Sequence, residues 1–113
     1  MGYLCRFALS VVNTLTDRYD KQSRQYVEQF LIFYNEHISR GSMDKLDGFI
    51  IPDGTYGDYV KWYECTNDLC LFSKYYPKKT FLLKIVDEDD ISSHIYIRNG
   101  KMVKQSTIEK VII

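Results

Sequence analysis

The longest periodic pattern of apolar residues lies between residues 21 and 39. Apolar side chains recur there at spacings of three and four, which places them on one side of a helix: Tyr26, Val27, Phe30, Leu31, Tyr34 and Ile38. Ile32 and Phe33 widen this arc, as is typical of a helix that lies flat on a sheet. Asp20 is placed to accept from the first free amides, and Gly41 to close the far end. The pattern predicts one long amphipathic helix over Lys21–Ser39.

Several shorter segments have the composition of strands. Gly2–Asn13 is almost continuously apolar, which predicts a central strand that is either covered on both faces or has one exposed face that binds something. Gly48–Ile51 is a short strand before a Pro-Asp-Gly turn, and Thr80–Val86 is a second buried strand. Ser92–Arg98 alternates like a half-exposed strand. Asn99-Gly100 is the strongest hairpin signal in the chain, so Lys101–Lys104 should pair back, and Thr107–Ile113 either extends or follows that strand.

The middle of the chain allows two interpretations. Tyr56–Cys65 alternates well enough to be the return strand of a hairpin, and a short helix over Asp68–Tyr75 would then follow, capped by Thr66 or Asn67. Alternatively, residues 58–63 join residue 66 onward as one longer helix. In either case Pro77 prevents the helix from continuing.

With the strand interpretation, the first six elements follow the order βαββαβ. This order predicts a single α+β domain over residues 1–113 of the ferredoxin-like kind. We expect an antiparallel sheet with two helices on one face and a C-terminal β-hairpin. The other face would be open or covered by a partner.

Composition supports a folded protein inside the cell. The chain has 113 residues, which suits one domain, and is 45% hydrophobic and 15% aromatic. Its three cysteines are an odd number and lack zinc-ligand spacing, so the simplest interpretation is a reduced intracellular protein. The apolar segment over residues 3–12 contains Arg6 and is too short to span a bilayer. We therefore expect a soluble cytoplasmic protein, without membrane association.

The net charge is zero, which argues against non-specific binding to nucleic acid or anionic lipid. The charges are nevertheless separated along the chain: the net charges of residues 1–43, 44–70, 71–84, 85–97 and 98–113 are +1, −4, +4, −4 and +3. Such blocks can form one-sign surface patches. Adjacent strands could equally neutralise each other.

The C-terminal half resembles a family of small phage- and plasmid-encoded proteins, the YubB-like proteins of ferredoxin fold. The resemblance rests on Trp62-Tyr63, on Phe72-Ser73-Lys74-Tyr75-Tyr76-Pro77, on Phe81, on the acidic stretch to Asp90-Ile91, and on Tyr96-x-x-Asn99-Gly100-Lys101. The acidic stretch lacks a Gly-Glu pair, and the residue directly before Tyr96 is Ile95 and not a tryptophan. The resemblance implies an accessory protein of a mobile element and no agreed chemistry.

Two groups of residues are candidates for binding a partner protein. Aromatic side chains anchor protein interfaces, and charged residues at the rim raise the association rate. The candidates are therefore the tyrosine-rich region 56–63 and the acidic run 87–90. These residues are Tyr56, Tyr59, Trp62, Tyr63, Asp87, Glu88, Asp89 and Asp90. The run lacks the spacing and the glycine of a calcium loop, and four adjacent carboxylates are also typical of a solvated turn.

A third group combines basic and aromatic residues, which suits contacts with phosphates and bases. Its members are Lys74, Tyr75, Tyr76, Lys78, Lys79, Arg98, Lys101 and Lys104. The alternative is a helix end with its usual cations, followed by a solvated turn. No Lys/Arg-Gly-Phe strand motif of RNA-recognition domains is present.

Catalytic chemistry has little basis in the sequence. Cys65 precedes a helix, the position that activates a thiolate, but Glu64 and Asp68 beside it oppose that charge. His37 and His94 are far apart in sequence and have no metal-ligand spacing. We therefore expect no catalytic residues, no metal and no cofactor.

These observations favour a non-enzymatic protein that binds another protein. Our first hypothesis is a phage or mobile-element inhibitor of a host defence complex, of the anti-CRISPR kind, whose partner is a host protein or ribonucleoprotein complex. The alternative is a small nucleic-acid-binding domain. A homodimer through the open sheet face or the C-terminal strand stays open.

Overall fold

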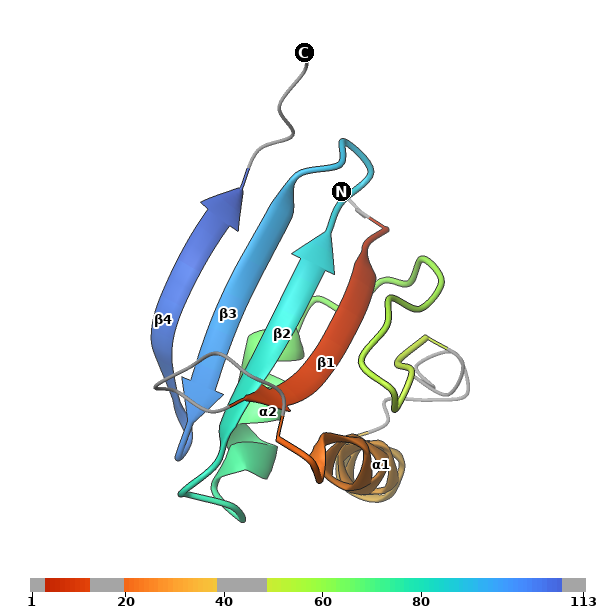
Figure 1. The fold of residues 1–113 in the computed structure, drawn as a ribbon. Coiled ribbons are helices and arrows are strands. Elements are labelled where there is room, and N and C mark those ends of the chain that lie inside the picture. Colours follow the sequence, from red (N-terminus) through yellow and green to blue (C-terminus); the bar gives the residue numbers. More distant parts are fainter. Residues whose placement is uncertain (1–3, 13–19, 39–48, 109–113) are drawn as a thin grey trace.

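The protein is an α+β fold built on a four-stranded antiparallel sheet (Figure 1). A computed structural model describes residues 4–12, 20–38 and 49–108. The strands are β1 (Arg6–Val12), β2 (Thr80–Val86), β3 (Ser92–Arg98) and β4 (Lys101–Ile108), paired in the order β1-β2-β3-β4. The predicted strands at 80–86 and 92–98 are confirmed at their bounds.

The β3–β4 connection is the hairpin that the sequence predicts. Asn99 and Gly100 have φ values of 49° and 81°, the positive pair that a two-residue turn of this kind requires. Pairing with β3 continues past Lys104 to Ile108, so Thr107 and Ile108 extend the strand, one of the two predicted possibilities. A register shift between Tyr96 and Ile97 leaves one extra residue in β4.

The long amphipathic helix is confirmed, with a change of geometry near its end. It forms α1 (Ser23–Phe33) and continues without a break as the π-helical turn η1 (Tyr34–Ile38). The Asp20 carboxylate accepts from the Gln22 amide over 2.7 Å, but the helix begins one residue after Gln22, at Ser23, and no side chain in the described residues caps its first amides. Gly41 and Ser39 lie outside the described residues.

The second helix, α2 (Cys65–Ser73), begins three residues before the predicted position and ends two earlier. Its first turn contains Asp68, which is 1% exposed and accepts from the indole N–H of Trp62 over 2.8 Å. Neither Thr66 nor Asn67 is the predicted cap, because the helix begins at Cys65 directly after Glu64, and the Asn67 amide donates to the Glu64 carboxylate.

One face of the sheet packs against both helices. It presents the odd-numbered residues of the strands, which pair across the sheet as Val11–Phe81–Ile97 and Leu9–Leu83–Ile95. The Phe81 ring contacts Tyr26 of α1 and Phe72 of α2, with centroid distances of 6.4 and 5.5 Å. The main hydrophobic core therefore lies between this face and the helices.

The ferredoxin-like order βαββαβ is not observed in the described residues. The order there is β1, α1, η1, α2, β2, β3, β4. The strands predicted at 48–51 and 56–65 are therefore not formed in the described residues. Their described parts make only isolated bridges, Ile50 with Tyr56 and Val60 with Cys5. The alternative of one helix from residue 58 is also wrong, because α2 begins at Cys65.

A mismatch in length explains why residues 57–60 are not a strand. Gly57 donates to the Phe7 carbonyl and Val60 exchanges two bonds with Cys5, so this segment follows the outer edge of β1. Two residues lie between Gly57 and Val60, but only one lies between their partners, Cys5 and Phe7. The two segments therefore cannot stay in register, and no regular ladder of hydrogen bonds forms. A Cβ on Gly57 would lie 1.9 Å from the Phe49 carbonyl oxygen, so only glycine fits there.

The first strand differs from its prediction in position and not in burial. It begins at Arg6 and lies at the end of the strand order, so β2 and β3 are the central strands. Every residue from Phe7 to Val12 is nonetheless buried, which is the first of the two possibilities that its continuous apolar character predicts. The segment over 57–60 protects its outer edge from other strands.

We expect Trp62→Phe to lower the free energy of unfolding by about 2–4 kcal/mol. The change removes packing volume and one donor to the buried Asp68 carboxylate. Urea denaturation followed by circular dichroism measures this loss. Tyr75→Phe, at a ring that is 66% exposed, is the control and should change stability by less than about 0.5 kcal/mol. Equal effects of the two changes would contradict the burial of Trp62.

Candidate functional site

Residues from the two predicted protein-binding groups meet at one end of the sheet. The turn between β2 and β3 lies at the same end as the start of β1 (Figure 1). There Leu4, Tyr59 and Glu88 line a shallow depression, and Glu88 accepts from the Leu4 amide over 2.9 Å. We call this region the tyrosine–acidic corner and define it as Leu4, Arg6, Tyr56, Tyr59, Glu88, Asp89 and Asp90.

Arg6 holds the two tyrosines of the corner in place. Its guanidinium carbon lies 5.7 Å from the Tyr56 ring centroid and 5.9 Å from that of Tyr59, within reach of cation–π attraction. The Arg6 Nε donates to the Gly57 carbonyl over 2.9 Å. Tyr59 is 40% exposed, so part of its ring is open to a partner.

The acidic run divides into a structural residue and surface residues. The Asp87 carboxylate accepts from the amides of Asp89 and Ile91, which closes the turn. Asp90 has a positive φ of 61°, a conformation that aspartate tolerates in turns. Glu88, Asp89 and Asp90 are exposed, and they provide the acidic surface of the corner.

Negative charge at the corner also affects a neighbouring thiol. Burial, followed by the nearby Asp87 and Glu88, raises the pKa of Cys5 above its usual value. Asp58 lies beside Tyr59 and its carboxylate accepts the Tyr59 amide over 2.8 Å. Carboxylates from the two acidic blocks of the sequence, 44–70 and 85–97, therefore flank the same tyrosine.

Besides Asp87, which closes the turn, two of the predicted aromatic residues do not belong to the corner. Trp62 is 5% exposed and its ring contacts Phe7 and Phe30, with centroids 5.1 and 5.6 Å apart, so it is a core residue. Its indole N–H donates to the buried Asp68 carboxylate over 2.8 Å, which also holds the side chain in the core. Tyr63 is 67% exposed but does not line the depression beside Glu88.

The predicted basic and aromatic group is brought together only in part: Arg98 beside the β3–β4 hairpin donates to the Pro77 carbonyl over 3.3 Å, whereas Tyr76 and Lys79 contact α1 and Asp20 before it. Lys79 forms an ion pair with Asp20 over 2.7 Å and lies 5.4 Å from the Tyr26 ring centroid. Tyr76 packs on Tyr26 and Phe72. Of residues 74–79, Tyr76 and Lys79 are half-buried and the other four are exposed. The Lys74 side chain lies against Gly100, so it is close to the β3–β4 hairpin.

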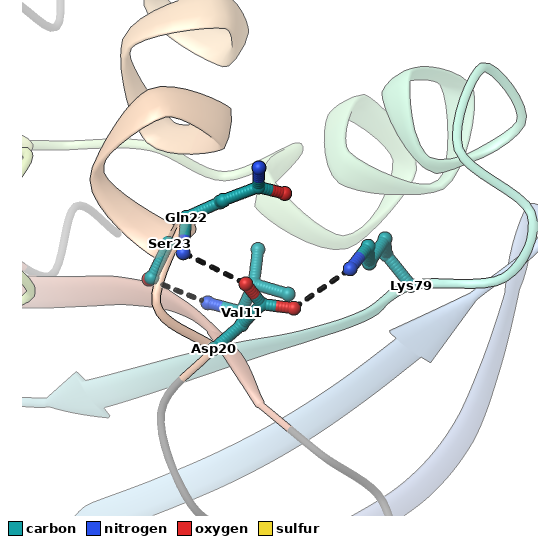
Figure 2. Close-up of polar contacts among 5 residues, drawn as sticks. All are labelled: Val11, Asp20, Gln22, Ser23 and Lys79. Atoms are coloured by element: carbon teal, nitrogen blue, oxygen red, sulfur yellow. Dashed lines mark hydrogen bonds and ion pairs between the residues drawn. The ribbon is translucent and has the colours of Figure 1, made fainter.

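The Lys79–Asp20 pair belongs to a polar junction at the start of α1 (Figure 2). One Asp20 oxygen accepts from Gln22 and the other from Lys79, while the Ser23 hydroxyl accepts from the Val11 amide. These bonds connect β1, α1 and the residue before β2. The Lys79 hydrogen bond and then the Gln22 amide lower the pKa of Asp20, and Asp20 raises the pKa of Lys79.

The cysteines and histidines do not converge on a reaction centre. Cys65 is buried at the start of α2, and burial raises its pKa to about 11, so the thiol is protonated at neutral pH. His37 lies on η1, whereas His94 lies on β3. Among the described residues, no group of three or more His, Cys, Asp or Glu side chains could hold a metal ion.

The structure also contains a groove that the sequence did not indicate. Two depressions between the α1–η1 helix and α2 share Phe33, His37 and Tyr75, and Ile32 and Leu71 line their edges. Ile32 and Leu71 are each 49% exposed. The wide apolar arc of the first helix, with Ile32 and Phe33, was the only sequence feature that could have indicated this groove. The sequence could not show that α2 leaves part of that arc uncovered.

Comparisons with known proteins do not assign the chain to a family. No protein-family model matches it, and neither does a curated protein or a solved structure. Within the described residues, no helix is long and apolar enough to cross a membrane.

We expect Asp20→Asn to lower the free energy of unfolding by about 1 kcal/mol at pH 7, because a charge-assisted hydrogen bond is lost. The folded-state pKa of Asp20 is lowered, so its stabilisation is present above the usual aspartate pKa of about 3.9 and disappears as pH falls through the lowered value. Urea denaturation at pH 7 and at acidic pH should therefore show the difference from wild type shrinking.

Lys79→Met should produce a similar loss at pH 7, and the double variant should lose less than the sum of both. Glu28→Gln neutralises an exposed carboxylate on α1, the helix that Asp20 precedes, and is the matched control. Additive losses, or a difference that is independent of pH, would contradict the ion pair.

Proposed function

We propose that this chain is a non-enzymatic protein that binds the basic, nucleic-acid-binding surface of a partner protein through its tyrosine–acidic corner. The observation that carries the proposal is the depression shared by Leu4, Tyr59 and Glu88. It places an exposed aromatic ring beside exposed carboxylates, which is the composition of an interface anchor with a charged rim.

The charge of the corner selects the partner. Glu88, Asp89 and Asp90 are adjacent and exposed, and Asp58 flanks Tyr59 from the other acidic block. A cluster of carboxylates attracts Lys- and Arg-rich surfaces and raises the association rate. Proteins that bind nucleic acid carry such surfaces, so occupation of one by this corner would exclude the nucleic acid.

The sequence resemblance suggests where such a protein would act. Accessory proteins of phages and plasmids, to which the YubB-like resemblance points, often act by blocking host machinery. The proposed activity is therefore inhibition of a host defence complex, of the anti-CRISPR kind, in the host cytoplasm. The partner would be a host protein or ribonucleoprotein complex.

The first test neutralises the exposed acids. Asp89→Asn/Asp90→Asn should weaken capture of nucleic-acid-binding proteins from nuclease-treated host lysate by about tenfold, which corresponds to about 1.4 kcal/mol. Asparagine suits the positive φ of Asp90, and Asp87 is left unchanged because it closes the turn. Quantitative mass spectrometry of the captured proteins is the measurement.

The matched control is Glu28→Gln/Glu36→Gln, which removes the same charge from exposed positions on the α1–η1 helix. It should leave capture unchanged. The aromatic anchor is tested in the same way, with Tyr59→Ala against Tyr75→Ala. If the corner variants and the controls capture the same proteins to the same extent, the corner is not the interface.

A further inference from the structure

The sheet strands carry only one sign of charge. Across β1, β2, β3 and β4 no aspartate or glutamate occurs, whereas five basic residues do: Arg6, Lys84, Arg98, Lys101 and Lys104. The described acids lie on helices, loops and turns. The sheet is therefore a basic surface within a chain of zero net charge.

Strand register places all five of these cations on the face that points away from the main core, but the Arg6 side chain donates to Gly57 at the outer edge of β1 and lies apart from the other four. Directly paired residues share a face, and the even-numbered rows run Thr80–Arg98–Lys101, Leu82–Tyr96–Lys104 and Lys84–His94–Ser106. On the side of this face formed by β1 and the first residues of β2, the side chains are buried: Ser10, Thr80 and Leu82. The accessible part is the basic face, defined as Lys84, His94, Tyr96, Arg98, Lys101, Lys104 and Ser106.

Two ring side chains lie among these cations. Tyr96 and His94 occupy alternate positions of β3 and are half-buried, with part of each accessible. The Lys104 Nζ lies 5.3 Å from the Tyr96 ring centroid. Burial and then Lys84 lower the pKa of His94, so neutral imidazole is the main form at pH 7. The face thus offers planar rings bordered by positive charge.

We propose that the basic face binds single-stranded nucleic acid, with Lys84, Arg98, Lys101 and Lys104 contacting phosphates and Tyr96 and His94 contacting bases. Charge complementarity selects a polyanion, since the strands contain no carboxylate to repel it. The rings select accessible bases, which a duplex keeps stacked inside. A four-stranded sheet surface is also too broad for the major groove of B-DNA, about 12 Å wide.

This inference concerns a different surface from the tyrosine–acidic corner and stands independently of it. The acidic turn follows β2, while Arg98 and Lys101 flank the β3–β4 hairpin at the opposite end of the strands. Asp89→Asn/Asp90→Asn should therefore bind oligonucleotides at least as well as wild type. Failure of one proposal would leave the other unchanged.

The test is fluorescence anisotropy with a labelled oligothymidylate of about 20 nucleotides, long enough to cover one binding site. Wild-type protein should bind with a dissociation constant of about 10⁻⁶–10⁻⁴ M. Lys101→Gln/Lys104→Gln should bind about tenfold more weakly at low salt, and its slope of log affinity against log salt should fall by about 1.4, or about 0.7 for each lost phosphate contact. Tyr96→Leu should weaken binding and leave this slope unchanged.

The matched control is Lys21→Gln/Lys61→Gln, which removes two exposed cations outside the sheet. It should retain wild-type affinity and slope, and circular dichroism verifies that every variant folds. No binding by wild type, or an equal loss in the control pair, would overturn the proposal. Preference for a duplex of the same length, or for inorganic polyphosphate, would overturn its assignment to single-stranded nucleic acid.

Discussion

Packing around Phe30 is the constraint on which the rest of the structure depends. This ring is fully buried on α1 and contacts Tyr34, Trp62 and Phe72, at centroid distances of 6.2, 5.6 and 5.4 Å. Its contacts therefore join both helices to the segment that precedes α2. Since Trp62 in turn packs on Phe7, the same cluster reaches β1 and positions residues 57–60 along that strand. Trp62 is therefore buried in this cluster, whereas Tyr59 in the same segment is 40% exposed.

Elements governed by local rules were predictable from the sequence. Thr80–Val86, Ser92–Arg98 and the Asn99-Gly100 turn depend on strand composition and on residues that accept positive φ, and all are observed as expected. The π-helical turn and the early start of α2 were not predictable. They depend on where Tyr34 and Trp62 find space in a core formed by distant segments. The predicted strand over residues 56–65 was wrong for a similar reason. The segment has one residue more than the part of β1 that it contacts, and nothing in its own sequence shows this mismatch.

The candidate site was predictable as residue types and not as a surface. Tyr59 and the exposed acids were selected from composition, but Leu4 and Arg6 contribute only because β1 pairs with β2 and brings its start beside the acidic turn. Trp62 was selected by the same rule and lies in the core, since the aromatic character that favours interfaces also favours burial. Likewise, Lys79 has the composition of a phosphate ligand and serves to anchor α1 through Asp20.

The separation of charge along the sequence survives in three dimensions. Neutralisation between adjacent strands requires opposite signs on β2, β3 and β4, and their charged residues are all basic. The acidic turn and the basic hairpin lie at opposite ends of β3, a strand of seven residues, or about 24 Å at about 3.4 Å per residue. The Debye length at physiological ionic strength is about 8 Å, so each end interacts with solvent and partners largely without the other. A net charge of zero therefore does not describe either surface, and each attracts the class of partner that its own sign selects.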